Sequence, residues 1–421
     1  MLYDQEPKTK AEQGSEETKE ESYSFMKETI KSSRKKDFLQ ITKMAFGGLL
    51  FGIFACCGFF ALKPWAERTF YNETATVSIP EDEEIENEEV AEIISEAPIL
   101  SAESYEEIMQ SMYDIAQEAE KSLVNIQSIQ EGTLEEGEQE TYRTTGVIVA
   151  DNGLEYLVLT DDSICEEAET WNVTFVDNKE YKVQLKKRDK TRGIAIFSVH
   201  KSSLKSETKN ALKVSELGNS NIVQRGNVVI ALGDMFGYEG AVGYGIVSSV
   251  EHELACADGF CGIIATDIEM ASSGSGVLVN QSGEVIGLIK NGIWKEEENH
   301  TTNALAISDL KAALQLLVND KGVPYVGIYG TMVTKEIAEE EGIPEGFYVT
   351  SVEGDSPAMQ AGIQVGDIIQ SIGDSEITSL SAYQRNVLNT EIGKEVKIKA
   401  QRRGAEEYVK VDFKVMVGSK E

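Results

Sequence analysis

Apolar residues gather first in one unbroken run, residues 44–62 (MAFGGLLFGIFACCGFFAL), which contains no charged side chain. Because a helix rises about 1.5 Å per residue, these nineteen residues span about 30 Å, the thickness of the hydrocarbon layer of a bilayer. Cationic residues precede the run, and a strongly acidic stretch follows it. The positive-inside bias therefore predicts a transmembrane helix over residues 44–63, with the N-terminus in the cytoplasm. A cleavable signal peptide is the alternative, although no small-residue cleavage site follows the run.

The segments on either side of this run are predominantly polar. Residues 1–43 are rich in Lys, Glu and Ser, and we interpret them as a disordered cytoplasmic tail. Residues 64–103 include a stretch, 77–100, with many carboxylates and no Lys or Arg. Mutual repulsion of these charges favours an extended acidic stalk outside the cytoplasm.

A helical spacing of apolar residues begins at residue 104 and ends near residue 121. Its members are three or four positions apart: Tyr105, Ile108, Met112, Ile115 and Ala119. The pattern then changes to about a dozen short runs bounded by Gly, Asp or Asn, among them TGVIVA, EYLVLTD, GIAIFSV, NVVIALG and EVIGLIK. Strands of this length and spacing predict a barrel-type all-β domain over residues 104–320.

The last part of the chain, residues 321–417, mixes strands with short helices. Strands are predicted at FYVTSV, DIIQSI and EVKIKAQ, and helices at SPAMQAG and from residue 381 to about residue 390. These elements predict a small α+β module that begins at KGVP, residues 321–324. The chain as a whole is thus expected to be mainly β.

The composition and net charge of the chain limit the classes of partner and cofactor that these domains are expected to bind. The 39 Lys and Arg against 72 Asp and Glu leave a net charge of −33. Such an acidic chain repels phosphate backbones, which argues against nucleic acid as a partner. No phosphate-binding glycine loop or cluster of metal ligands stands out in the sequence, so neither a cofactor nor a metal is expected.

The ordered set of motifs resembles the HtrA (DegP-like) family of trypsin-fold serine proteases with a C-terminal PDZ domain. The matching stretches include SLVNI, TGVIVADNG, YLVLTDDSI, TRGIAI, VVIALGDMFG, GYGIVSSV, SSGSGVLVNQSGEVIGL and NALAI, in family order. The SPA..AGI..GD.I motif of HtrA-type PDZ domains appears within residues 356–369. The resemblance covers about 300 residues. It implies a chymotrypsin-like double β-barrel followed by a PDZ domain.

The same resemblance locates the three positions of a Ser-His-Asp triad, which needs a nucleophile, a base and an acid that orients the base. The family's histidine falls at Ser163 in TDDSI, its aspartate at Gly193 in RGIAI, and its serine at Gly274 in SSGSG. A shift of one residue would put Ser273 or Ser275 at the nucleophile position. The triad is therefore expected to be degenerate and the barrel domain to be a pseudoprotease.

Other residues do not supply the missing base. The chain has three histidines, His200, His252 and His300, and none falls where the fold would place the base. Ser272 also replaces a glycine whose flexibility normally lets an amide turn toward the substrate oxygen. The alternative function is an active serine-type endopeptidase with a non-standard catalytic group, in which an acid or a lysine assists the serine.

PDZ domains bind the free C-terminus of a peptide by adding it as a strand, while loop amides capture its carboxylate. By resemblance, Val326, Gly327 and Ile328 present those amides, and Tyr383 and Val387 line the other wall of the groove. Core packing on one helix face explains Tyr383 and Val387 equally well. The module is expected to bind unfolded or C-terminal peptide segments of exported proteins.

The cysteines outside the apolar run suggest one further feature. Cys256 and Cys261 lie five positions apart in CADGFC, on the predicted extracytoplasmic side, where thiols oxidise. A disulfide that closes this loop is therefore a candidate, whereas two thiols without a nearby histidine fall short of a zinc site. Cys165 remains as a buried small residue or a free thiol.

These elements predict a single-pass protein of the cell membrane with its C-terminal domains outside the cytoplasm. Its function would be recognition or scaffolding in quality control of exported proteins. Members of the HtrA family often trimerise through the N-terminal segment of the protease domain, so the resemblance also implies a homotrimer.

Overall fold

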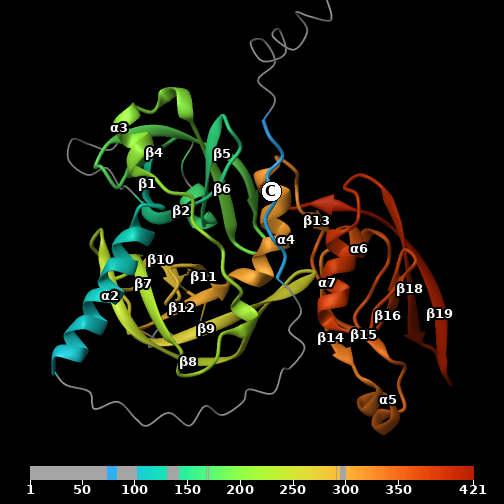
Figure 1. Ribbon diagram of the computed structural model, residues 1–421. Coiled ribbons are helices and arrows are strands. Elements are labelled where there is room, and N and C mark those ends of the chain that lie inside the picture. Colours follow the sequence, from blue (N-terminus) through green and yellow to red (C-terminus); the bar gives the residue numbers. More distant parts are fainter. Residues whose placement is uncertain are drawn as a thin grey trace, which may run out of the picture. The chain divides into compact units, whose positions relative to one another are not determined.

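The computed structural model describes residues 74–82, 102–129, 142–166, 168, 170–290, 292–293 and 300–421 (Figure 1). The predicted tail and transmembrane helix, residues 1–63, lie outside these ranges, as does most of the predicted stalk. Within the ranges, no helix is both long enough and apolar enough to cross a bilayer. The transmembrane helix therefore stays a prediction from sequence.

Helix α2 (Ala102–Glu120) confirms the helical spacing seen in the sequence, with each end shifted by one or two residues. Ala116 is completely buried, and Met112, Ile115 and Ala119 pack partly against the same core. The remaining face is exposed to solvent. The helix therefore covers the barrels with one apolar stripe.

The first barrel closes from six antiparallel strands in the order β1-β2-β3-β6-β5-β4. Its strands are β1 (Leu123–Ile129), β2 (Arg143–Asp151), β3 (Glu155–Asp161), β4 (Thr170–Phe175), β5 (Glu180–Asp189) and β6 (Ile194–His200). Short helices follow β3 and β6: η1 (Asp162–Cys165), η2 (Lys201–Ser203) and α3 (Ser206–Ala211). Along β1, Val124, Ile126 and Ser128 are buried while their neighbours are half-buried, as expected when alternate side chains face a barrel interior.

The second barrel has the strand order β10-β11-β12-β9-β8-β7. Its strands are β7 (Val228–Asp234), β8 (Ala241–Cys256), β9 (Gly259–Glu269), β10 (Ser275–Val279), β11 (Val285–Ile289) and β12 (Thr301–Ala306), and η3 (Ser220–Ile222) precedes them. Strands β10 and β11 are buried along their whole length, because β10 also contacts β2 of the first barrel and β11 also contacts helix α4. One apolar core thus joins the two barrels.

Helix α4 (Ile307–Val318) was not among the elements expected from the sequence. It follows β12 directly, and Leu310, Leu314 and Leu317 are completely buried on its inner face. The expectation of strands alone from residue 122 to residue 320 was wrong at this point, because the apolar residues of 307–318 recur at helical spacing.

The C-terminal module confirms the expected mixture of strands and short helices. Its main sheet contains β14 (Ile328–Val333), β15 (Gly346–Val352), β16 (Ile368–Ile372), β17 (Ser375–Glu376), β18 (Glu395–Arg403) and β19 (Tyr408–Met416). A two-stranded sheet pairs β13 (Pro324–Tyr325) with β20 (Gly418–Ser419). The helices are α5 (Lys335–Glu341), α6 (Pro357–Gln360) and α7 (Leu380–Leu388). Figure 1 shows the module in orange and red, with α6 and α7 in orange and the hairpin of β18 and β19 in red; α6 contacts β19 and α7 contacts β16.

Candidate functional site

The family's histidine position, Ser163, lies in the short helix η1 directly after strand β3. Asp161 caps this helix, because its Oδ1 accepts a hydrogen bond of 2.9 Å from the Ser163 amide. The side chain of Ser163 is exposed, while Asp161 and Asp162 beside it are buried. A serine here has no ring nitrogen and cannot act as the general base of a triad.

An ion-pair network lies at the family's aspartate position, Gly193. Lys290, which follows β11, forms an ion pair with Asp161 and donates a hydrogen bond of 3.2 Å to the Gly193 carbonyl. Arg188 donates to Asp162 Oδ2 at 3.0 Å. Burial raises the pKa of the Asp162 carboxyl, and the hydrogen bond from Arg188 opposes this effect. A Cβ atom added to Gly193 would lie 2.6 Å from Lys290 Nζ, so the ammonium stands where an acid side chain would begin.

Gly274, which the resemblance predicts at the family's serine position, is buried and closed to side chains. A Cβ atom added there would lie 2.8 Å from the Met235 carbonyl oxygen and 3.0 Å from that of Ala271. Real Cβ atoms essentially never approach backbone within 3.0 Å, so no larger residue fits without backbone movement. The Gly274 amide donates to the Ala271 carbonyl at 2.9 Å. An oxyanion hole needs such an amide free to donate to substrate, and here the amide is already bonded.

The two neighbouring serines differ in exposure. Ser273 is exposed. Ser275 is buried, and its Oγ accepts a hydrogen bond of 2.9 Å from the Thr145 amide and lies 3.3 Å from Thr145 Oγ1. Ser275 therefore ties β10 of the second barrel to β2 of the first, and both partners of its hydroxyl belong to a threonine.

The three histidines all lie at exposed positions. His200 ends β6 with its Nε2 3.5 Å from Glu155 Oε1, and His252 lies within β8. His300 precedes β12, and its carbonyl accepts a hydrogen bond of 2.6 Å from the Met270 amide.

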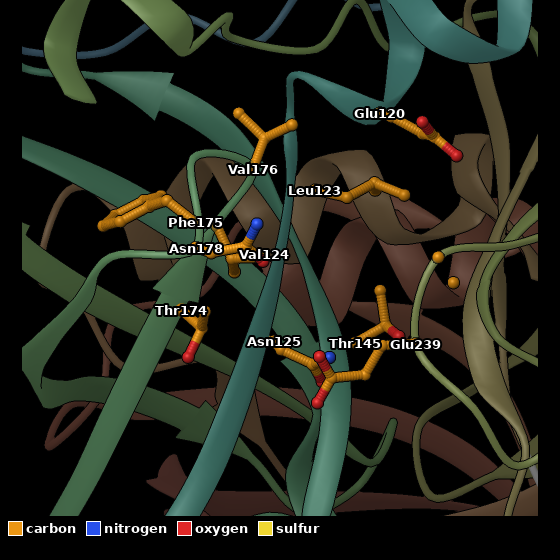
Figure 2. Close-up of a pocket in the computed structure, with 12 residues that line it drawn as sticks. Glu120, Leu123, Val124, Asn125, Thr145, Thr174, Phe175, Val176, Asn178 and Glu239 are labelled. Carbon is orange, nitrogen blue, oxygen red and sulfur yellow. The ribbon is translucent and has the colours of Figure 1, made fainter. Parts of the chain in front are cut away.

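Figure 2 shows a cavity of about 280 Å³ beside β1 and the turn after β4. Leu123, Asn125, Phe175 and Glu239 are among its walls, and Thr145 separates it from the Ser275 hydroxyl. None of the three triad positions lines it. The lining residues combine apolar and neutral polar groups with the carboxylates of Glu120 and Glu239 and include no histidine, lysine or cysteine.

The 326–328 loop forms the second chemical feature of the chain. The amides of Val326, Gly327 and Ile328 donate hydrogen bonds of 2.6, 2.8 and 3.1 Å to the carboxylate of Asp258, in the hairpin between β8 and β9. Gly327 has φ +93°, a conformation that favours glycine, and it lets the three amides converge. Three converging amides make an anion-binding arrangement.

Tyr383 and Val387 of helix α7 are both buried in the core of the C-terminal module. The ring of Tyr383 stacks on Phe347 with a centroid separation of 3.8 Å. Its hydroxyl donates to Asp258 Oδ1 at 3.0 Å, so Tyr383 is a core residue whose polar end reaches the 326–328 loop.

Glu353 stabilises the 326–328 loop through hydrogen bonds to the loop and to residues beside it. Its carboxylate accepts hydrogen bonds from Tyr325, from Tyr329 at 2.9 Å and from Lys420 at 2.8 Å. Its amide donates to the Gly327 carbonyl at 2.9 Å. Burial and the hydrogen bond to Glu353 raise the pKa of Tyr329 to about 12, so the Tyr329 hydroxyl remains a donor.

The candidate disulfide between Cys256 and Cys261 is not formed, and both residues are buried free thiols. In the strand register, Cys261 pairs with Leu254, and Cys256 pairs with Gly259, so the two cysteines are diagonal rather than opposite. The hydrogen bond between the two thiols lowers the pKa of Cys256 and raises that of Cys261. Cys165 is also a buried free thiol, and burial raises its pKa to about 12.

The sequence did not predict Lys290 in the ion-pair network at Gly193, nor Asp258 at the 326–328 loop. Lys290 follows an ordinary buried strand, and no local signal marks it. Asp258 lies in an Asp-Gly turn with φ +62°, a typical hairpin signal inside the cysteine loop CADGFC.

Comparison with known proteins places these domains in a class. The family model of the trypsin-like peptidase domain matches residues 144–288, and that of the PDZ domain matches residues 324–413. A "Probable periplasmic serine endoprotease DegP-like" of Hahella chejuensis is 31% identical over 286 residues, 66% of this chain and 58% of the relative. A protein of the same description from Halomonas elongata is 28% identical over 275 residues, 63% of this chain and 55% of that protein. The chain thus spans somewhat more than half the length of these curated relatives.

Solved structures agree on the fold. The "HtrA-type protease AlgW with decapeptide" superposes with a TM-score of 0.53 at 22% identity and covers 73% of this chain and 99% of that one. The same protease with a tripeptide gives a TM-score of 0.53 at 23% identity over 73% of this chain and 97% of that one. A trypsin-like peptidase domain followed by a PDZ domain defines the class. The chain has this domain order and is similar in both domains to HtrA-type and DegP-like serine proteases.

Proposed function

We propose that this chain is an HtrA-type pseudoprotease, anchored in the membrane, whose PDZ module binds exposed peptide C-termini outside the cytoplasm. Its role is recognition or scaffolding in quality control of exported proteins. The support differs between the two domains, because the peptidase domain lacks side chains that the chemistry needs while the PDZ module keeps its amide donors.

The packing at Gly274 is the observation that carries the loss of proteolysis. A serine nucleophile at this position would need its Cβ within 2.8 Å of the Met235 carbonyl oxygen. The Gly274 amide is also bonded to Ala271, so the nucleophile and one oxyanion donor are both missing from the same turn. Either loss alone typically costs several orders of magnitude in rate.

The alternative of an active serine endopeptidase requires a base beside Ser273 or Ser275. The hydroxyl of Ser275 bonds to Thr145 instead, and Lys290 is held by Asp161 and the Gly193 carbonyl. An ammonium paired with a carboxylate cannot accept a proton from serine. These contacts favour a pseudoprotease over an active serine endopeptidase.

A fluorophosphonate probe on the full chain tests this proposal. We expect no labelling under conditions in which an active trypsin-fold protease is labelled completely. Labelling that disappears in Ser273→Ala or in Ser275→Ala, but not in Ser272→Ala, would establish the enzyme instead.

Peptide binding by the PDZ module is supported by the three convergent amides of the 326–328 loop and by the left-handed backbone at Gly327. A peptide with a free C-terminus should bind the full chain, and the same peptide with a C-terminal amide should not, because the amide lacks the second anionic oxygen.

A pair of glycine variants, whose peptide binding is measured by fluorescence polarisation, checks the site. In Gly327→Ala the new Cβ would collide with Ser356 and lie 2.7 Å from the Tyr325 hydroxyl, so we expect affinity to fall at least about tenfold. Gly373→Ala is the matched control, since Gly373 also has positive φ but has no atom within 4 Å of the new Cβ. Equal affinity in the two variants would place the peptide elsewhere.

The anchor over residues 44–63, the extracytoplasmic location and the homotrimer belong to the same proposal. The name of the curated relatives, which describes them as periplasmic, supports the location. Protease protection of the N-terminal tail in sealed vesicles, and the mass of the detergent-solubilised chain in sedimentation, test the anchor and the trimer separately.

A further inference from the structure

The hairpin between β8 and β9 carries a carboxylate that is completely enclosed by protein. Asp258 sits at its tip and is 3% exposed. Its left-handed φ of +62° turns the side chain away from the barrel and into the 326–328 loop. Among the described residues, four donors reach the carboxylate, and all are neutral: the three loop amides and the Tyr383 hydroxyl.

The main chain of the hairpin bonds to the PDZ module as well. The Asp258 amide donates to the Ile328 carbonyl at 2.8 Å, and the Ile328 amide donates to the Asp258 carboxylate, so the two residues are bonded in both directions. The Phe260 amide donates to Gln384 Oε1 at 3.3 Å, and Gly259 lies so close to Gln384 that an added Cβ would be 2.7 Å from Oε1. The hairpin therefore contacts both the loop and helix α7.

This set of contacts has the form of a C-terminal peptide. The last residue of a PDZ ligand pairs its backbone with the edge strand and gives its carboxylate to the loop amides. Asp258 supplies both with one residue, since its side chain takes the place of the terminal carboxylate and its amide bonds to the start of β14.

We propose that Asp258 is an internal ligand of the PDZ module, so that the β8–β9 hairpin and a peptide C-terminus occupy the same amides and exclude each other. This inference rests on the proposed function of the module in peptide binding. Binding of a peptide then requires the hairpin to leave, and its apparent affinity is reduced by the fraction of molecules in which the hairpin is undocked. Peptide recognition is thereby coupled to the second barrel, from which the hairpin extends.

Two substitutions at the tip of the hairpin test the competition. Asp258→Gly keeps the left-handed turn and removes the carboxylate, and Asp258→Asn keeps the shape with one acceptor oxygen in place of two. We expect a peptide with a free C-terminus to bind Asp258→Gly at least about tenfold more tightly than the unsubstituted chain, with Asp258→Asn in between. Asp374→Asn, which removes the same charge from an exposed turn of the module, is the control and should bind like the unsubstituted chain.

A second measurement needs no substitution. Cys256 lies two residues before the docked Asp258 and is only 6% exposed, so release of the hairpin should increase its alkylation by iodoacetamide, whereas Cys261 lies in the barrel core. Cys165, buried in the first barrel, is the internal reference and should not change. Peptide mapping by mass spectrometry is expected to show the increase when a free C-terminal peptide is added, and none with the amidated peptide.

The outcomes separate this inference from the function on which it rests. Tight binding of a free C-terminal peptide with the same affinity in the unsubstituted chain and in Asp258→Gly, and with no change in alkylation, would overturn the internal ligand alone. Absence of binding in the unsubstituted chain and in both Asp258 variants would overturn peptide binding itself, and the internal ligand with it.

Discussion

The triad positions and the 326–328 loop differ in what their chemistry requires. A Ser-His-Asp triad consists of three side chains, and at the positions that the resemblance predicts for it this chain has Ser163, Gly193 and Gly274. Carboxylate capture by a PDZ loop consists of backbone amides, and those amides converge on an anion in this chain. A few substitutions remove a side-chain site while the fold persists, whereas a backbone site persists as long as the loop keeps its conformation.

Gly193 and the 326–328 loop also differ in the group that occupies each of them. At Gly193, the ammonium of Lys290 occupies the space of a missing side chain and pairs with buried carboxylates. At the 326–328 loop, the Asp258 carboxylate occupies intact donors. The Lys290 ammonium compensates buried negative charge, whereas the Asp258 carboxylate takes the place of a peptide ligand.

The largest expected effect comes from restoring the nucleophile. Gly274→Ser places a Cβ against the Met235 and Ala271 carbonyls, so we expect the free energy of unfolding to fall by about 3 kcal/mol. Gly354→Ser, at a glycine with nothing near the new Cβ, is the control and should change it by less than about 0.5 kcal/mol. Urea unfolding measures both.

The triple variant Ser163→His, Gly193→Asp and Gly274→Ser should remain inactive toward casein, because the turn at Gly274 does not present an oxyanion amide. Recovery of casein hydrolysis in this variant would show that the turn at Gly274 can present its amide to substrate. The triad positions would then be as functional as the 326–328 loop.

A smaller effect is expected from Lys290→Ala. Removal of the ammonium leaves Asp161 buried without its ion-pair partner, which should lower the free energy of unfolding by about 2 kcal/mol. Lys414→Ala breaks an exposed pair with Glu395, which solvent screens, and should change the free energy of unfolding much less. If thermal and urea unfolding show equal losses for the two variants, the Lys290 network does not compensate buried charge.

The smallest effect concerns the support of the 326–328 loop and depends on pH. Burial opposes the charge of Glu353, but hydrogen bonds from Lys420, Tyr325 and Tyr329 outweigh it and lower the pKa. A lowered pKa in the folded state contributes stability above the ordinary value of about 4.3, and this contribution is lost as pH falls through the folded-state pKa. Glu353→Gln should therefore lower the free energy of unfolding at pH 7, by about 1 kcal/mol, the usual net contribution of a hydrogen bond, once solvent screening is allowed for.

Urea unfolding of Glu353→Gln and the unsubstituted chain over a range of pH tests this dependence. The difference between the two chains should shrink steadily once the pH falls below about 4. A difference that stays constant down to the lowest pH would assign the effect to lost packing rather than to charge.

Local patterns predicted most of the elements. Helix α2 and the strands of both barrels follow from apolar spacing and turn residues, which act between close neighbours in the chain. Helix α4 was missed, although Leu310, Leu314 and Leu317 recur at helical spacing.

The identities of the residues at the triad positions, the excess of negative charge and the long apolar run are properties of the sequence itself, and so is the expectation of a degenerate triad. Only the tertiary structure decided what occupies those places. Lys290 meets Asp161 across 129 residues, and Asp258 meets Val326 across 68. Contacts at such separation depend on how barrels and loops pack, and local propensity carries no information about them.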